Sequence, residues 1–465
     1  MSLHASSDLS HLQLNQRQQQ AIREIESGKN IFITGPSGVG KSVVIRYFRG
    51  NCSDDGVAVT STTGVSALLL GGATTLHSYL GIGLGTQSVD QMVEHIRKRR
   101  YGHKHLKRWL TLTRLIIDEV SMLDPDLFDK LELMARILRG NNLPFGGVQL
   151  ILTGDFLQLP VVGSSKLCFE AKSWETCQIT PVFLTEIVRQ PDPEFQQCLN
   201  EVRIAQLSPK TVRMLHELSR NVLTETNGIR PTIVYSKKAD VDAANSIELD
   251  NLNARAAEEG GEGIEFFGYD MVVTLNEGES SAWKDRIIDG IKSKCPAPSR
   301  LELCVGAQVM LLTNLNIEEG LVNGSRGVVT GFVEHIPLVR FLGADEILVA
   351  HHTWDFYEGD QITASATQIP LQLAWASTIH KLQGVTLDFA VLNLDTIFEY
   401  GQAYVALSRV RSRKGLAIRG LKVASIKAHP RALEFYKAHP VEQSQDPPSQ
   451  DPPAYEPPDS PANEQ

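Results

Sequence analysis

Short apolar runs that end in a glycine or a polar turn recur along this chain. Strands buried on both faces of a parallel sheet read as unbroken apolar or β-branched runs, so these segments predict such strands. Helical segments separate several of them, which is the order of an α/β fold. The predicted strands are residues 31–34, 56–60, 114–118, 148–153, 183–190 and 231–236, and the predicted helices are residues 14–22, 43–48, 193–204 and 237–252.

The pattern changes between residue 260 and about residue 369, where short alternating strands and frequent glycines replace the apolar runs. The segment L-V-N-G-S-R-G at residues 321–327 is typical of this region. We therefore expect a small β domain inserted into the α/β fold, which residues 374–386 then resume. A chain of 465 residues has room for about two to four domains, so such an insertion is compatible with its length.

The strand at residues 31–34 leads into the glycine-rich run T-G-P-S-G-V-G-K-S and then into a helix. Strand, glycine-rich turn and helix in this order form a phosphate-binding loop, whose backbone N–H groups point at a polyphosphate. Lys41 can reach the β- and γ-phosphates, and the Ser42 hydroxyl can ligate a bridging Mg²⁺. We predict a nucleoside triphosphate site made by Gly35, Pro36, Ser37, Gly38, Val39, Gly40, Lys41 and Ser42.

A carboxylate pair supplies the second half of this site. Asp118 and Glu119 follow the apolar strand at residues 114–118. The first carboxylate can hold Mg²⁺, mostly through water, and the second can polarise the attacking water. Gln158 follows the next buried strand, and its amide can sense the γ-phosphate.

A glutamine ahead of the phosphate loop can read the edge of adenine, because its amide donates and accepts hydrogen bonds at once. Gln16, Gln18, Gln19 and Gln20 are all available in the predicted first helix, and the pattern does not choose among them. Gln18 is taken as the candidate contact to adenine, so the expected nucleotide is ATP.

The net charge of −9 is unfavourable for a nucleic-acid protein if it is spread evenly, so its location along the chain matters. Six acidic residues and no basic ones lie in the tail from residue 440 onward, which leaves 48 acidic against 45 basic residues elsewhere. A nearly neutral body can still carry one basic channel, because binding depends on the local potential. Residues 97–108 hold seven Lys or Arg and indicate either a phosphate-contacting surface or a solvated helix face.

Other classes of protein are disfavoured by the composition. No apolar run of about 18 residues exists, so no membrane span is expected. The N-terminus has no secretory pattern, and the six cysteines form no C-x-x-C pair or zinc spacing. We therefore expect reduced thiols, an intracellular location and no protein-ligated structural metal.

These motifs resemble the superfamily 1 DNA helicases. The resemblance rests on the phosphate loop, I-I-D-E-V-S-M at residues 116–122, G-G-V-Q-L-I-L-T-G-D-F-L-Q-L-P at residues 146–160, and residues 375–388. Residues 126–147 are similar to the signature segment of the Pif family, the helicases named for petite integration frequency. The resemblance extends from about residue 14 to residue 436.

The resemblance implies two RecA-like α/β domains with ATP and Mg²⁺ in the cleft between them and a small β-barrel inserted in the second. The implied division is an ATP-binding domain at 1–180 with a wedge-type insertion around 75–108, a second domain at 181–255 and 370–436, the barrel at 256–369, and a disordered, proline-rich acidic tail at 437–465. It also implies translocation from 5′ to 3′ on single-stranded DNA and unwinding of duplex or structured DNA in replication, repair or recombination.

The resemblance further assigns site residues. Arg189 and Arg409 match arginines that reach the γ-phosphate from the second domain, and Gln402 precedes Arg409 as a further nucleotide contact. Tyr404 also lies beside it, but helical packing explains that residue equally well. Hydroxyl-rich turns and nearby basic groups are expected to grip DNA phosphates without reading bases. These candidates are Thr62, Thr63, Thr75, His77, Thr378, His380 and Lys381.

The expected partners are single-stranded and forked DNA, with G-quadruplex and RNA–DNA hybrids as further candidates. In a eukaryotic cell the expected location is the nucleus or the mitochondrion. Residues 452–455 match the P-P-x-Y pattern of WW-domain ligands, which a proline-rich tail also produces by chance. Two rival hypotheses are a RecD-like recombination helicase and a non-unwinding ATP-dependent DNA-binding switch. The Pif signature argues against the first, and a metabolite kinase would leave both arginines without a role.

Overall fold

The computed structural model describes residues 13–440 apart from short gaps. The gaps are residues 71–72, 84, 99–101, 162, 165, 226–227, 259–264, 276–280, 317–318, 320 and 359–360. The sequence predicts that the tail begins at residue 437, but residues 437 and 438 are helical; the rest of it from residue 441, with its P-P-x-Y motif at residues 452–455, lies outside the described residues. Within the described part, no helix combines the length and the apolar character that crossing a membrane requires.

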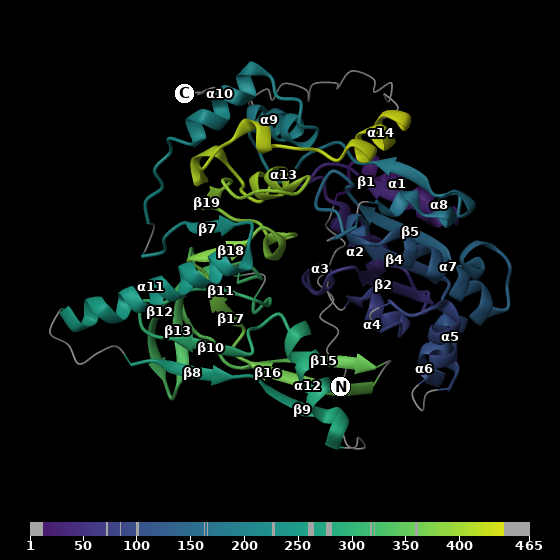
Figure 1. Cartoon of the computed structure of the whole chain (residues 1–465), viewed down its shortest axis with the longest axis horizontal. Helices are drawn as coiled ribbons and strands as arrows, with labels where there is room; N and C mark the ends of the chain where they lie inside the picture. The colour runs from purple at the N-terminus through teal and green to yellow at the C-terminus, as the bar shows by residue number, and fades with distance from the viewer. Residues whose placement is uncertain are drawn as a thin grey trace, which may run out of the picture.

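The first part of the chain folds into a six-stranded parallel sheet with the order β3-β2-β4-β5-β1-β6, seen at the right of Figure 1. Its strands are β1 (Ile31–Thr34), β2 (Val57–Ser61), β3 (Thr74–Thr75), β4 (Arg114–Asp118), β5 (Gln149–Gly154) and β6 (Thr180–Phe183). Its helices are α1 (Gln16–Glu26), α2 (Lys41–Asn51), α3 (Gly64–Leu69), α4 (Leu76–Leu80), α5 (Val89–Lys98), α6 (Gly102–Thr111), α7 (Pro125–Arg139) and α8 (Lys172–Thr176).

Strand β1 is fully buried, as its unbroken apolar run predicts, because helices cover both faces of the sheet. Ile31 and Ile33 belong to the core that includes Val44 of α2. Phe32 faces the opposite core and lies 4.8 Å from Phe156, measured between ring centroids. The two cores clamp β1 and thereby fix where the phosphate loop begins.

The predicted strand at residues 183–190 is wrong. Strand β6 pairs in parallel with β1 and ends at Phe183. The chain then leaves the sheet as an irregular segment, because the Val188 and Arg189 amides donate to the Gly38 carbonyl instead of to a neighbouring strand. The predicted domain boundary at residue 181 is also displaced, since β6 completes the first sheet.

The segment around residues 75–108, expected to be a wedge-type insertion, contains the three helices α4, α5 and α6. Leu80, Met92, Ile96 and Trp109 are buried in the core shared with α7. The Trp109 indole N–H donates to the Leu80 carbonyl at 3.1 Å. In its described residues the segment therefore packs as part of the first unit.

A second parallel sheet has the order β18-β7-β19-β20. Its strands are β7 (Thr232–Tyr235), β18 (Ala376–Thr378), β19 (Ala390–Asn393) and β20 (Leu416–Arg419), and its helices are α9 (Pro193–Arg203), α10 (Pro209–Leu218), α11 (Lys238–Glu258) and α13 (Gln402–Leu407). Figure 1 places this unit beside the first, at the upper left. A separate buried core contains residues of α9, α10, α13 and β19.

The inserted region contains antiparallel strands and helix α12 (Ser281–Lys294). Its sheets have the orders β10-β8, β14-β13-β12-β11-β17 and β15-β16-β9. The strands are β8 (Phe267–Asp270), β9 (Val272–Leu275), β10 (Arg300–Leu303), β11 (Gln308–Leu311), β12 (Arg326–Val333), β13 (Ile336–Phe341), β14 (Glu346–Leu348), β15 (His352–Glu358), β16 (Gln361–Gln368) and β17 (Leu371–Leu373). The described strands form separate open sheets, so the expected closed barrel is not confirmed.

The last helix, α14 (Pro430–Ala438), returns to the first unit although it follows the second sheet in the chain (Figure 1). Phe435 is buried in the first core, where its ring stacks on Phe169 at 4.5 Å and meets Phe156 at 5.4 Å. The predicted second domain, which ran to residue 436, therefore ends before this helix.

Candidate functional site

The phosphate loop joins β1 to α2, and two of its glycines are required by close approach. A Cβ on Gly35 would lie 2.0 Å from the Leu184 carbonyl oxygen, and one on Gly38 would lie 2.7 Å from the Arg189 Cβ. Gly38 also has a φ of +86°, which side-chain-bearing residues rarely adopt. The loop is thus packed tightly against the segment that follows β6.

Lys41 opens α2 and bends back over the loop. Its Nζ donates to the carbonyl oxygens of Gly35 and Pro36, at 2.8 and 2.9 Å. Burial lowers the pKa of Lys41, and the charges of Asp155 and Glu119 oppose this shift. The adjacent Ser42 hydroxyl forms no hydrogen bond within the described part of the chain, so it is available to a ligand.

The carboxylate pair lies where β4 ends. Asp118 is buried and accepts hydrogen bonds from Ser66 Oγ at 2.7 Å and from Thr153 Oγ1. Glu119 has φ 55° and ψ 44°, a left-handed conformation that is uncommon for a residue other than glycine. Its Oε2 accepts from Gln383 Nε2 at 3.0 Å, a contact that reaches across from the second unit.

The pKa of Glu119 is raised to about 7 by burial and by the neighbouring Asp118, and Lys41 and Arg409 reduce the shift. A carboxylate with a pKa near the working pH can accept a proton and release it again. This is the property required of a group that activates water.

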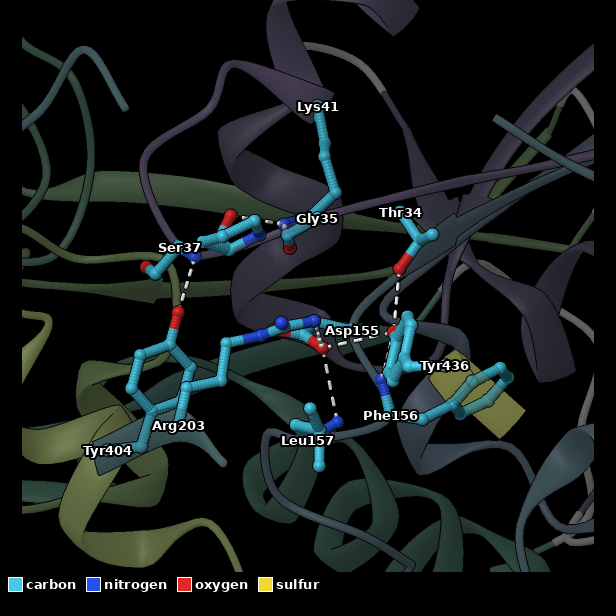
Figure 2. A network of polar contacts seen from close by, with 11 residues as sticks. Thr34, Gly35, Ser37, Lys41, Asp155, Phe156, Leu157, Arg203, Tyr404 and Tyr436 are labelled. Carbon is cyan, nitrogen blue, oxygen red and sulfur yellow. Dashed lines mark hydrogen bonds and ion pairs between the residues drawn. The ribbon is translucent and has the colours of Figure 1, made fainter. Parts of the chain in front are cut away.

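Two arginines converge on one oxygen of the phosphate loop. Arg189 Nη1 and Arg409 Nη2 donate to Ser37 Oγ at 2.8 and 2.7 Å. Burial lowers the pKa of both guanidiniums, and for Arg409, where Arg189 adds repulsion, it falls to about 9. The hydroxyl of Tyr404 on α13 accepts from the Ser37 amide at 2.7 Å (Figure 2). Three side chains therefore meet at Ser37: Arg189 from the segment after β6, and Tyr404 and Arg409 from the second unit.

A buried acid links the first sheet to two other elements. Asp155 follows β5 and receives two hydrogen bonds of 2.8 Å from Arg203 at the end of α9. The Tyr436 hydroxyl of α14 donates to the same carboxylate at 3.0 Å, and it also lies 2.7 Å from Thr34 Oγ1 (Figure 2). Arg203 attracts the carboxylate and holds the pKa of Asp155 below its usual value despite burial.

Among the four candidate glutamines, the structure brings Gln18 to the loop. Gln18 is buried, and its Nε2 donates to the Val39 carbonyl at 3.2 Å. Its Oε1 accepts from the Asn15 amide, so both ends of the side chain are already engaged. A nearby cavity of about 370 Å³ is lined by Gln13, Leu14, Gln19 and Tyr47.

The remaining two candidates for nucleotide contact, Gln158 and Gln402, lie in different surroundings. Gln158 is buried; its backbone N–H donates to the Asp155 carbonyl, whereas its side-chain amide forms no hydrogen bond within the described residues. Its backbone is close to the second unit, because a Cβ on Gly401 would lie 2.6 Å from the Gln158 carbonyl oxygen. Gln402 Oε1 accepts from the Phe398 and Glu399 amides, and its buried Nε2 has no hydrogen-bond partner within the described residues.

The first group of predicted DNA contacts lies at the adjoining ends of β2 and β3, where Ser61 pairs with Thr75. Thr63 Oγ1 accepts from the Ser66 amide at 3.2 Å, and Thr75 Oγ1 accepts from the Ser78 amide at 3.3 Å. Each hydroxyl keeps its hydrogen for a further acceptor. His77 lies in the first turn of α4.

Thr62 is different from its neighbours. Its Oγ1 donates to the Glu119 carbonyl at 2.9 Å, and its amide donates to the Asp118 carbonyl at 3.1 Å. The one hydroxyl hydrogen of Thr62 is therefore used by the Glu119 backbone, so this residue connects the turn after β2 to the main chain that carries the carboxylate pair.

The second group lies where β18 ends. Thr378 Oγ1 accepts from the Lys381 amide at 3.2 Å, and Lys381 Nζ donates to Gln372 Oε1 at 3.2 Å. His380 Nε2 is 3.7 Å from Glu399 Oε2. Burial lowers the pKa of Lys381. These residues are two to five positions before Gln383, which contacts Glu119.

Sequence reasoning missed the side chains that connect the units. Asp155 directly follows β5 and could have been found by its position, as Asp118 was. Arg203 and Tyr436 carry no local signal, because their role depends on elements far away in the chain. Tyr404 has a signal that helical packing explains equally well, and Gln383 is recognised only by its contact with Glu119 across the two units.

Comparisons with known proteins agree with this arrangement. A family model described as PIF1-like helicase matches residues 13–209, and one described as the 2B domain of DNA helicase Pif1 matches residues 287–332. The crystal structure of Pif1 helicase from Candida albicans is 35% identical, with a TM-score of 0.76 over 92% of this chain and 99% of that chain. This chain belongs to the PIF1-like helicase family.

Two further PIF1 relatives are similar over most of this chain. The ATP-dependent DNA helicase PIF1 of Xenopus laevis is 38% identical over 91% of this chain, which spans 64% of the frog protein. Pif1 from Bacteroides sp in complex with ADP-AlF4 is 29% identical, with a TM-score of 0.75 over 92% of this chain and 97% of that chain. A Bacteroides Pif1 structure has also been determined with bound single-stranded DNA.

Proposed function

We propose that this chain is an ATP-dependent DNA helicase that moves from 5′ to 3′ along single-stranded DNA and unwinds duplex or structured DNA. The convergence of Arg189 and Arg409 on Ser37 of the phosphate loop carries the proposal. A site that joins a phosphate loop to arginines of a second unit hydrolyses ATP only when the units are closed. The family relatives that are named as DNA helicases support the same function.

The two parallel sheets form two RecA-like domains in this proposal. The sequence predicts the first domain at residues 1–180, and we add strand β6 and helix α14 to it. The second retains residues 184–255 and 370–429, and the inserted β region at 256–369 packs beside it. ATP lies between Lys41 on one side and the two arginines on the other.

The residues divide the hydrolysis between them. Lys41 leaves the Gly35 and Pro36 carbonyls and neutralises the β- and γ-phosphates. Glu119 accepts a proton from the attacking water, and Arg189 and Arg409 stabilise charge that develops in the transition state. Gln158 reports the terminal phosphate to the loop that contains Gly401.

Two residues fit a magnesium ion. Ser42 has a free hydroxyl, and both Asp118 oxygens already accept a hydrogen bond, which favours contact with the ion through water. Mg²⁺ held there would supply positive charge to the phosphates. Adenine is assigned to the cavity beside Gln19 and Tyr47, and Gln18 holds the loop that forms one side of the site.

DNA is proposed to cross the ends of β2, β3 and β18. The hydroxyl groups of Thr63, Thr75 and Thr378 retain donors for phosphate oxygens, and His77, His380 and Lys381 lie in the adjoining turns. Thr62 contacts the backbone carbonyl of Glu119 and Gln383 contacts its carboxylate, so both turns are connected to the catalytic residue. Backbone contacts of this kind imply little sequence specificity, so single-stranded and forked DNA, G-quadruplexes and RNA–DNA hybrids are all substrates to assay.

Strand displacement on duplexes with different tails tests the function. We expect ATP-dependent displacement of a duplex with a 5′ single-stranded tail or a fork, and little displacement of blunt or 3′-tailed duplexes. Equal unwinding from 3′ tails would contradict the direction of movement. ATP hydrolysis with DNA binding but no displacement from any tail would contradict the helicase and favour a DNA-binding switch.

Arg409→Ala and Arg189→Ala should lower kcat by about 10³-fold, the order expected when an arginine that stabilises the transition state is lost. ATP binding should remain within a few-fold of the wild-type value, because most of the arginine charge acts in the transition state. Steady-state hydrolysis and nucleotide titration measure the two effects. Arg411→Ala, an exposed arginine on the same segment, is the matched control. Lost binding with an unchanged rate at saturation would refute the assignment of either residue.

A further inference from the structure

The side chain of Ser37 accepts two charged hydrogen bonds at once. Its Oγ lies 2.8 Å from Arg189 Nη1 and 2.7 Å from Arg409 Nη2. Both guanidiniums have additional partners that fix them, because Arg189 donates to the Ser408 carbonyl and Arg409 to the Val405 carbonyl. Ser37 is almost completely buried. Its hydroxyl is therefore held in one place by two rigid donors.

In this arrangement the Ser37 hydroxyl can still donate one hydrogen bond. A serine hydroxyl has two acceptor lone pairs and one donor hydrogen. The two arginines use both lone pairs, and no acceptor for the hydrogen exists among the described residues. The O–H group is therefore free to point at an acceptor that the described residues do not provide.

The backbone of Ser37 gives an independent reason for such a donor. Phosphate loops bind polyphosphate through inward-pointing backbone N–H groups. The Ser37 amide is directed elsewhere, because it donates to the Tyr404 hydroxyl at 2.7 Å (Figure 2). At this position the side-chain hydroxyl is the only donor of Ser37 that remains for a phosphate oxygen.

We propose that the Ser37 hydroxyl donates a hydrogen bond to the terminal phosphate of ATP, and that Arg189 and Arg409 polarise it and fix its direction. The inference rests on the proposed function, since it requires ATP between the phosphate loop and the two arginines. The positive charges beside Oγ strengthen the O–H donor, and this donor becomes most valuable as charge grows on the transferred phosphoryl group. Ser37 thereby joins the arginines of the second unit to the phosphate loop in one transition-state contact.

Ser37→Ala tests the proposal because it removes the hydroxyl and keeps the backbone bond to Tyr404. We expect kcat for DNA-stimulated ATP hydrolysis to fall by about 10- to 100-fold, as for the loss of one charge-assisted donor to the transition state. Affinity for ADP with aluminium fluoride should fall by a similar factor, whereas affinity for ADP alone should stay within about twofold. Ser37→Thr, which retains a hydroxyl, should recover most of the rate.

Ser27→Ala is the matched control, because this exposed hydroxyl only donates to the Glu24 carbonyl at the end of α1. A Ser37→Ala kcat within twofold of wild type would overturn the inference. So would a joint fall of kcat, ADP affinity and melting temperature, because that pattern indicates a purely structural contact. Failure of the proposed function is distinguishable, since the wild-type chain would then either not hydrolyse ATP or hydrolyse it without displacing a strand from any tailed duplex, whatever the result for Ser37→Ala.

Discussion

Lys41→Ala should reduce ATP hydrolysis to background and abolish strand displacement, with binding to single-stranded DNA within a few-fold of the wild-type value. Lys41 is the cation of the phosphate loop, and its loss leaves the β- and γ-phosphates without neutralising charge on that side. The proposed DNA contacts at the ends of β2, β3 and β18 do not involve this side chain. Hydrolysis with and without DNA and fluorescence-anisotropy binding measure the two effects.

The matched control is Lys29→Ala, because Lys29 lies just before β1 and forms only an exposed ion pair with Glu24. That variant should retain both activities. DNA-stimulated turnover near the wild-type level in Lys41→Ala would remove the phosphate loop from the mechanism. The melting temperature of Lys41→Ala shows whether a loss of activity reflects unfolding. We expect it to stay close to the wild-type value.

Glu119→Gln should lower kcat by about 10²- to 10⁴-fold, the usual contribution of a general base. Glutamine keeps the shape and can still accept the hydrogen bond from Gln383, so ATP binding and the contact between the units should be retained. The experiment compares single-turnover hydrolysis with ATP affinity. Glu26→Gln at the exposed end of α1 is the control. A Glu119→Gln variant with a normal rate would place the base elsewhere.

The pH profile gives a second test of Glu119. Its raised pKa of about 7 means that the carboxylate is protonated, and inactive as a base, below that pH. For the wild-type chain, kcat/KM should therefore rise with pH and level off above about pH 7, because kcat/KM reports the free enzyme. In Glu119→Gln the rise of kcat/KM with pH should disappear. If the variant kept this rise of kcat/KM with pH, the titrating group would be a residue other than Glu119.

Local patterns predicted the parts of the site that one segment of chain builds. The apolar run at residues 31–34 and the glycines after it placed β1, the loop and α2 within the observed bounds. Asp118 and Glu119 were found in the same way, because the end of a buried parallel strand always lies at the same edge of the sheet. For these residues, a single strand and the turn that follows it determine both where the side chain lies and which chemical group it carries.

Contacts between distant segments were not predictable in this way. The apolar run after residue 183 continues as if it were a strand, but tertiary packing of Leu184 and Val188 on the phosphate loop ends β6 there. Gln402 and Tyr404 lie on one short helix, and only the docking of that helix decides that Tyr404 reaches Ser37. Which of the four early glutamines is buried likewise depends on how α1 meets the loop.

The return of α14 to the first sheet has a consequence for folding during synthesis. Phe435 fills an aromatic cluster with Phe32, Phe156 and Phe169, and Tyr436 binds Asp155. The ribosome completes β6 at residue 183 but does not release residue 436 until roughly 10 to 50 s later, at usual elongation rates. During that interval the nascent first domain exposes the apolar site that α14 covers in the folded structure. A chaperone that binds aromatic surfaces would find its site there while the second domain is being made.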